Sequence, residues 1–164
     1  FRVEKAPEWR GQRVFVRHEV DGKGYELRLS EESAGTQKLM GLAAYLMTAL
    51  ERGATVVVDE LDAKLHPKLL RYVILLFKDP EVNKSGAQLI FSSQDVSTMR
   101  NDVFRRDEIW FAARGEGEAS QLWSLADIHE ANGNLVSKNA AFDKQYLSGR
   151  YGADPYLTRI EEWD

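Results

Sequence analysis

Three consecutive valines followed by two carboxylates constrain the fold of this chain more than any other feature. Val56, Val57 and Val58 predict a strand that is buried on both faces, because β-branched runs are typical of parallel strands covered by helices. Asp59 and Glu60 follow directly, at the strand end where open α/β sheets place their ligands. In a nucleotide hydrolase, the first acid would hold Mg²⁺ and the second would orient the attacking water. Taken alone, the pair is explained equally well as a solvated acidic turn.

A helix is predicted upstream of this strand, over about residues 34–52. Apolar residues recur there at helical spacing, and Gly53 marks the predicted end. Ser33 lies at the predicted start, close to Gly35. Free N–H groups and the helix dipole at this end suit a phosphate group, although this feature taken alone is better explained by Ser33 as a plain N-cap.

A second strand with a polar end is predicted downstream. Residues 89–91 are apolar and are expected to be buried, and Gln94 follows just beyond them. Because the carboxyl ends of neighbouring parallel strands meet at one edge, we expect Gln94 to lie near Asp59 and Glu60.

The remaining pattern predicts several further elements. Residues 12–29 alternate between apolar and polar and predict a hairpin that turns at residues 21–24. Pro67 suits the first turn of a second helix. Residues 107–113 and 121–125 predict an antiparallel pair. From residue 127 the pattern weakens and indicates a loosely packed or partly helical tail.

The order and spacing of these segments resemble the carboxyl-terminal half of an ABC-type ATPase domain. The resemblance is to the branch of ABC-like AAA proteins found in bacterial abortive-infection and defence systems, and it covers residues ~25–155. The matching segments are the ABC signature at 32–38, the Walker B strand at 56–60, the D-loop region at 61–67, the switch strand at 90–95 and a family-like end at 146–155. The Walker B strand together with His66 and Pro67 is the most specific part.

This resemblance implies an α/β fold for residues 1–164, as a partial ABC-type domain with a family-like tail at 127–164. The expected fold is a mostly parallel core sheet flanked by helices, with antiparallel hairpins. It implies ATP and Mg²⁺ as cofactors, and a second ATPase subunit as partner, with an effector protein under its control. The implied site residues are Glu60 and Gln94 in catalysis, Asp59 at Mg²⁺, and Ser33, Gly35, Thr36, Gln37 and Asp62 at nucleotide bound by the partner.

Two departures from the family pattern bear on activity. Gln94 replaces the usual switch histidine, and glutamine cannot carry a proton. No G-x-x-x-x-G-K-[ST] phosphate loop occurs in the sequence. The sequence is therefore expected to be a fragment whose phosphate loop lies upstream, and to be inactive alone. The alternative is a non-catalytic protein-interaction module. A nuclease that uses Asp59, Glu60 and Asp62 is disfavoured, because no further carboxylate completes its metal site.

Composition excludes several other classes of protein. The net charge of −4 gives no global drive toward nucleic acid. The absence of cysteine excludes disulfides and thiolate zinc, and is compatible with the cytoplasm. No apolar run approaches the ~18 residues of a membrane span. The sequence therefore predicts a cytoplasmic protein without a membrane segment.

Overall fold

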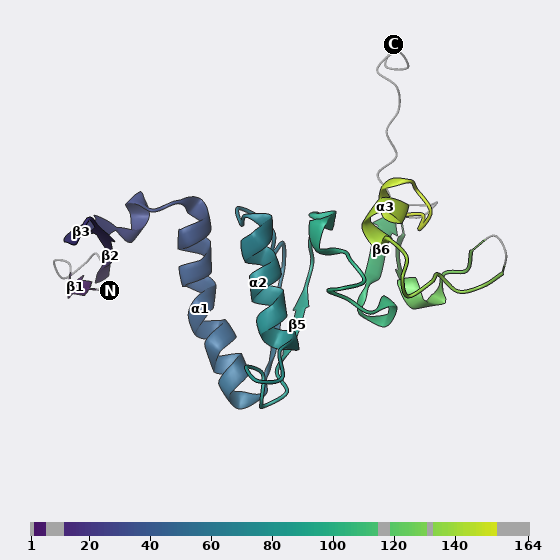
Figure 1. The fold of residues 1–164 in the computed structure, drawn as a ribbon, viewed down its shortest axis with the longest axis horizontal. Helices are drawn as coiled ribbons and strands as arrows, with labels where there is room; N and C mark the ends of the chain where they lie inside the picture. Colours follow the sequence, from purple (N-terminus) through teal and green to yellow (C-terminus); the bar gives the residue numbers. More distant parts are fainter. Residues whose placement is uncertain (1, 6–11, 115–118, 131–132, 154–164) are drawn as a thin grey trace, which may run out of the picture. The chain divides into compact units, whose positions relative to one another are not determined.

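The computed structural model describes residues 2–5, 12–114, 119–130 and 133–153 (Figure 1). The chain divides into two compact units, residues 1–94 and residues 95–164. Each unit is built around its own sheets, and each is considered by itself.

The first unit opens with an antiparallel sheet in the strand order β1-β2-β3. The strands are β1 (Arg2–Lys5), β2 (Gln12–Val20) and β3 (Lys23–Arg28). Val20 pairs with Lys23, so Asp21 and Gly22 alone form the turn, with φ angles of 50° and 71°. Left-handed φ at both positions is what a two-residue hairpin turn requires. The predicted hairpin is confirmed with a shorter turn, and β1 is an addition to it.

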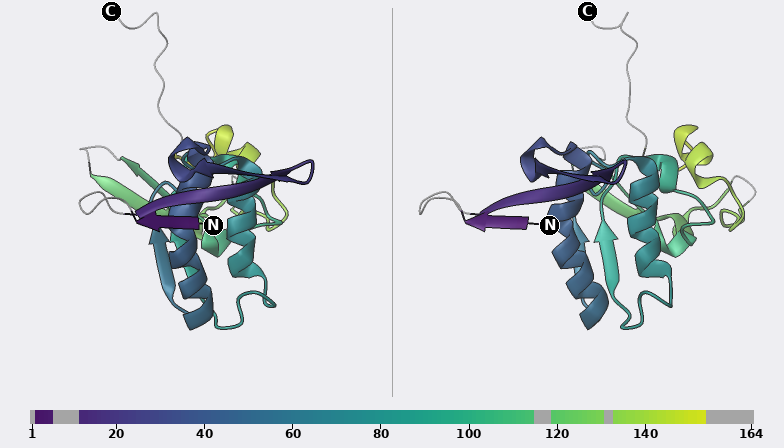
Figure 2. Two further views of the ribbon diagram at one scale, coloured as in Figure 1. Left: turned by 90° about the vertical axis from the view of Figure 1, so that its left-hand side faces the viewer. Right: turned by 60° about the vertical axis from the view of Figure 1, so that its left-hand side comes forward.

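The rest of this unit alternates helix and strand. Its elements are α1 (Ala34–Arg52), β4 (Thr55–Val58), α2 (Pro67–Lys78) and β5 (Gln88–Phe91). All four were predicted, and β4 and β5 pair in parallel. Figures 1 and 2 show α1 and α2 side by side, running opposite to the strands. The amino ends of both helices therefore lie at the same end of the unit as the carboxyl ends of both strands.

The parallel pair is covered on one face only. Val58 is 8% exposed, whereas its neighbour Val57 is 73% exposed. Ile90, which pairs with Val57, is 56% exposed. The prediction that both strands are buried on both faces is therefore wrong for Val57 and Ile90, because successive side chains alternate and the helices cover a single face. The parallel part is also smaller than expected, since the other sheets of the described residues are antiparallel.

The second unit is built around an antiparallel pair, β6 (Trp110–Arg114) and β7 (Ser120–Ser124). The pair was predicted, but residues 107 and 108 belong to a 3-10 turn before β6 rather than to the strand. The turn predicted between them is residues 114–117, of which 115–117 lie outside the described residues. Among the described residues, the unit's helical elements are η2 (Val96–Thr98), η3 (Arg106–Glu108), η5 (Leu125–Asp127) and α3 (Phe142–Leu147).

An aromatic core joins this pair to the end of the described chain. Phe111 of β6 stacks on Tyr146 at a centroid distance of 5.7 Å and lies 5.3 Å from the ring of Tyr151. Phe142 is 1% exposed in the same cluster. Burial raises the pKa of Tyr151 to about 12, and its hydroxyl donates to Gln145 Oε1 at 2.7 Å. The sequence indicated a loosely packed or partly helical tail from residue 127. The helix α3 confirms the partly helical alternative, and the burial of Phe142 and Tyr151 shows that the tail is packed into this core through Tyr151.

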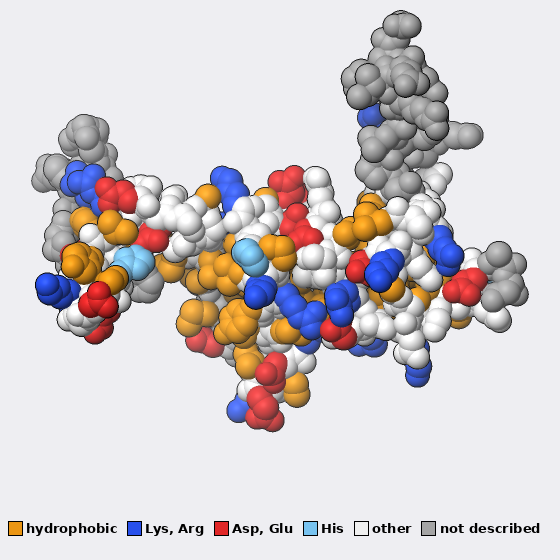
Figure 3. Space-filling view, turned by 45° about the horizontal axis from the view of Figure 1, so that its top comes forward, with side chains coloured by type: hydrophobic (Ala, Val, Ile, Leu, Met, Phe, Trp, Pro, Cys, Tyr) orange, Lys and Arg blue, Asp and Glu red, His pale blue; other side chains and the backbone are white. Residues whose placement is uncertain are grey.

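The surface is mixed in character. On the face drawn in Figure 3, acidic and basic side chains are interspersed with apolar ones. Within the described residues, no helix has the length and apolar character needed to span a membrane.

Candidate functional site

The predicted signature segment forms the amino end of α1, and its polar groups are bonded to one another. Ser33 is the N-cap, and its Oγ accepts from the Thr36 backbone N–H at 3.1 Å. The hydroxyls of Ser33 and Thr36 lie 2.8 Å apart. Gln37 Nε2 donates to the backbone oxygen of Glu32 at 2.8 Å. The segment therefore forms a well-capped helix start that needs no ligand to hold it together.

Gly35 lies against the loop that follows β4. A Cβ atom at this position would come within 2.7 Å of the Lys64 backbone oxygen. This contact is too close for any side chain, so the absence of Cβ is what lets the amino end of α1 approach the loop. The packing therefore explains the glycine at position 35 without reference to a nucleotide.

The Asp59 carboxylate, the Glu60 backbone and Ser92 meet at the adjoining ends of β4 and β5. Ser92 Oγ donates to Asp59 Oδ1 and accepts from the Glu60 backbone N–H at 2.8 Å. Ser92 N donates to the oxygen of Val58 at 3.1 Å, and Ser92 O accepts from Leu61 N at 3.0 Å. Two strand ends that are far apart in sequence are thus joined through a single serine.

Ser92 was not assigned to the site from the sequence, although a signal for it exists. Val58 pairs with Phe91, so the next residue of each strand, Asp59 and Ser92, fall side by side in a parallel ladder. Once the two strands are paired in this register, the serine is placed opposite the aspartate.

Glu60 has an unusual backbone conformation. Its φ is 49°, in the left-handed region that residues with a Cβ atom rarely adopt. Its backbone oxygen accepts from Lys38 Nζ at 2.5 Å and from Ala63 N at 3.1 Å. Glu60 is an exposed residue just beyond the carboxyl end of β4, where the sequence predicted it.

The segments predicted as D-loop and switch contact each other within the unit. The Gln94 backbone N–H donates to Asp62 Oδ2 at 3.3 Å. The other oxygen of this carboxylate, Asp62 Oδ1, is buried and has no hydrogen-bond partner among the described residues. Gln94 was expected near Asp59 and Glu60; the contact found for it is to Asp62, and its place beside the two acids remains a prediction.

The pair His66 and Pro67 begins α2. His66 is the N-cap, with Nδ1 accepting from the Lys68 backbone N–H at 3.1 Å, and Pro67 occupies the first turn. Proline suits this position because its missing N–H has no partner in a first turn.

The described residues contain no group of three or more His, Cys, Asp or Glu side chains able to hold a metal ion. Asp59 alone offers a carboxylate beside the Ser92 hydroxyl. This set fits Mg²⁺ only together with substrate phosphates, which is the usual way proteins bind it.

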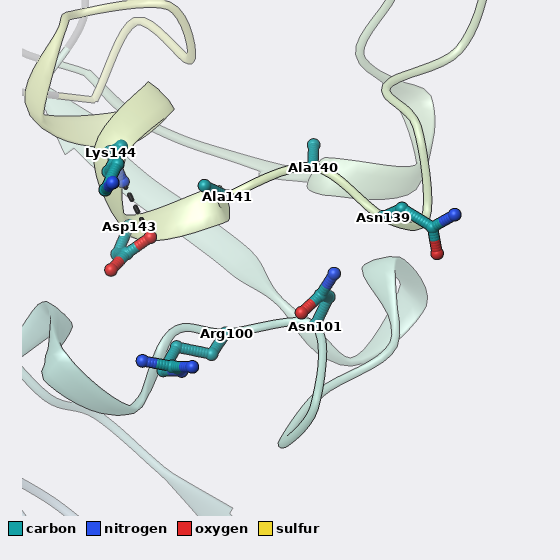
Figure 4. A pocket seen from close by; sticks show the side chains of 7 residues that line it. All are labelled: Arg100, Asn101, Asn139, Ala140, Ala141, Asp143 and Lys144. Atoms are coloured by element: carbon teal, nitrogen blue, oxygen red, sulfur yellow. Dashed lines mark hydrogen bonds between the residues drawn. The ribbon is translucent and has the colours of Figure 1, made fainter.

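The second unit has a polar hollow of about 220 Å³, shown in Figure 4. Arg100 and Asn101 form one side, and residues 139–141, 143 and 144 form the other. Asp143 Oδ1 accepts from the Lys144 backbone N–H at 2.8 Å. Cationic and anionic side chains both line this hollow, so its charge does not select one class of ligand.

Parallel strands whose carboxyl ends present acids beside helix amino ends form the edge at which open α/β sheets bind their ligands. The chain belongs to the AAA family described as "AAA domain, putative AbiEii toxin, Type IV TA system", whose match covers residues 2–100. The matched part runs from β1 through η2 and includes every predicted site residue. The resemblance noted at residues 146–155 lies outside it. No curated protein matches the chain.

Proposed function

We propose that this chain is the ATP-binding and hydrolysing lobe of a dimeric ABC-type ATPase that acts as a molecular switch. The observation that carries the proposal is the meeting of Asp59, Glu60 and Ser92 at adjoining parallel strand ends, beside the capped start of α1. Ligands of open α/β sheets bind at this edge, and acids there would act on a bound nucleotide through Mg²⁺ and the attacking water.

Glu60 is the proposed general base, which accepts a proton from the water that attacks the γ-phosphate. Asp59 is held by Ser92, and its second oxygen is the proposed ligand for Mg²⁺. Mg²⁺, when bound, neutralises charge on the phosphoryl group. Gln94 replaces a histidine as the proposed γ-phosphate contact, where its amide can donate a hydrogen bond but cannot transfer a proton.

The start of α1 is the proposed clamp on ATP that is bound by the partner subunit. Ser33, Gly35, Thr36 and Gln37 would meet that γ-phosphate, aided by the helix dipole. Because the Ser33 and Thr36 hydroxyls bond to each other here, they would exchange this bond for phosphate oxygens. Asp62 is the remaining proposed contact in trans. Its Oδ1 is buried in this structure, so the contact requires the loop after β4 to move when the two subunits close.

A second lobe that carries the phosphate loop is part of this proposal. The sequence contains no such loop, and Val57 and Ile90 expose the outer face of the parallel pair. Parallel strands are normally covered on both faces. The open face therefore supports further packing against that lobe. We place this assembly in the cytoplasm, where it would control an effector in a defence system.

A non-catalytic interaction module is the second candidate, and two observations favour it. Gln94 stands at the switch position, and the signature hydroxyls bond to each other without ligand. This candidate keeps the fold and the Asp59–Ser92 contact but predicts no ATP turnover in any assembly.

Glu60→Gln, made in a protein that joins this chain to its phosphate-loop lobe, tests the proposed function. The change keeps the side-chain shape and removes the base, so kcat for ATP should fall by about a hundredfold or more. ATP should then be trapped and the dimer stabilised, which size-exclusion chromatography with ATP would detect. Glu51→Gln, at an exposed position of α1, is the matched control and should leave both readouts unchanged.

Unchanged turnover together with no dimer shift in Glu60→Gln would remove the role assigned to Glu60. Absence of turnover in the unmodified joined protein would favour the interaction module. The 164-residue chain alone should show no ATP turnover above buffer, because it has no phosphate-gripping lysine of the Walker A type.

A further inference from the structure

Lys38 joins the start of α1 to the backbone of Glu60. Its ammonium group lies 2.5 Å from the Glu60 backbone oxygen, across a sequence separation of 22 residues. The lysine is half-buried, whereas Glu60 is exposed. The cation is therefore committed to a main-chain acceptor and does not extend freely into solvent.

The main chain that Lys38 contacts requires support. Left-handed φ at a residue with a Cβ atom persists only when its surroundings hold it there. Three hydrogen bonds do so at Glu60: Ser92 Oγ accepts from its N–H, and Ala63 N and Lys38 Nζ donate to its oxygen. Of these three, the Lys38 bond is the one that comes from α1.

The same end of α1 is packed tightly on the loop that carries Glu60. Gly35 approaches the Lys64 backbone oxygen so closely that a Cβ atom would lie at 2.7 Å. A hollow of about 410 Å³ lies alongside, lined by Ala34, Gln37, Lys38, Ala63 and Lys64. Because Lys38 stands one turn beyond Gly35 on a rigid helix, any shift of the helix start moves its ammonium relative to Glu60.

We infer that Lys38 is a positioning residue that couples the helix start to the catalytic glutamate. This inference rests on the proposed function, in which the first turn of α1 clamps ATP bound to the partner subunit. The clamped helix holds Lys38 against the Glu60 oxygen, and the supported backbone then directs the Glu60 carboxylate toward the water of its own site. Closure around one nucleotide is thereby signalled to the base that acts on the other.

The test compares three variants of the joined protein. Lys38→Met keeps the side-chain length and removes the hydrogen-bond donor. We expect kcat to fall about tenfold or more, which is the size of effect that loss of a charge-assisted hydrogen bond can produce. KM for ATP and ATP-dependent dimerisation should change less than about twofold, since Lys38 is assigned no nucleotide contact. Lys38→Arg retains a cationic donor and should recover most of the turnover. Lys64→Met, in the same hollow, is the matched control and should behave as the unmodified protein.

A second measurement uses the 164-residue chain without nucleotide. Ala63 N–H bonds to the Glu60 oxygen, so its hydrogen exchange reports on this turn. Exchange at Ala63 should quicken about tenfold in Lys38→Met and remain unchanged in Lys64→Met. Unchanged exchange in Lys38→Met would mean that the lysine does not support the turn, and would overturn the inference.

The kinetic outcomes separate this inference from the proposed function. If the unmodified joined protein turns over ATP and Lys38→Met does so equally well, the inference fails and the proposed function stands. Loss of dimerisation in Lys38→Met would make Lys38 part of the clamp and would also overturn it. If the unmodified protein does not hydrolyse ATP, the proposed function itself fails, and the coupling fails with it.

Discussion

The two units bury their apolar side chains in different ways. In the second unit, Phe111 is surrounded by aromatic rings, and Phe142 is almost fully buried. In the first unit, Val57 and Ile90 lie on an exposed face of the parallel pair, although Val58 beside them is buried. The difference shows that a β-branched sequence predicts burial of one face of a strand. Burial of the second face depends on a further layer of structure packing against it.

The largest effect on stability is expected in the aromatic core of the second unit. Phe142→Ala removes a ring that is 1% exposed and should lower the free energy of unfolding by about 3–5 kcal/mol. Urea unfolding followed by tryptophan fluorescence measures this, since Trp110 and Trp123 lie in β6 and β7. Leu147→Ala, at a residue 70% exposed in the same helix, is the control and should cost under about 0.5 kcal/mol. Equal effects of the two changes would contradict the burial of Phe142 in the aromatic core.

A smaller effect is expected at the start of α1. Gly35→Ala forces a methyl group onto the Lys64 oxygen and should destabilise the chain by about 1–3 kcal/mol. Gly41→Ala in the same helix meets nothing within 4 Å and should stabilise by about 0.5–1 kcal/mol, because alanine is the better helix former. Thermal unfolding followed by circular dichroism compares the two. A neutral Gly35→Ala would show that helix and loop are packed less tightly than the structure has them.

The smallest effect is expected on the open face. Val57→Thr should change stability by under about 0.5 kcal/mol in this chain, because the side chain is already 73% exposed. Val58→Thr, one residue along, buries a hydroxyl and should cost about 1–3 kcal/mol. Urea unfolding of both variants measures the contrast. In a protein joined to the phosphate-loop lobe, Val57→Thr should become costly, and a change that remains neutral there would mean that the lobe packs elsewhere.

Local patterns predicted the elements well. The apolar period and Gly53 placed α1 at the bounds found, and Pro67 placed the start of α2. These signals succeed because propensity, capping and periodicity act over a few residues. The exposure of Val57 contradicts the sequence-based expectation, and the packing of Tyr151 was not part of it, because both depend on distant parts of the chain.

The site itself was predicted less completely. Asp59, Glu60 and Ser33 were found at the expected ends of their elements, and their proposed roles remain predictions. Ser92 and Lys38 were missed, because their importance comes from contacts across 32 and 22 residues that no local pattern reveals. Recognising them requires the strand register and the helix position together.

The parallel pairing of β4 with β5 also determines when the site assembles during folding. The paired residues Thr55 and Gln88 are 33 positions apart, and α2 lies between the strands. Closing a loop of this length costs entropy that local helix formation does not. The hairpin and helices can therefore form early, whereas Asp59 and Glu60 gain Ser92 only when β5 joins the sheet. During synthesis, the acids remain without this partner until the chain has emerged beyond residue 92, so site assembly reports that this unit has folded.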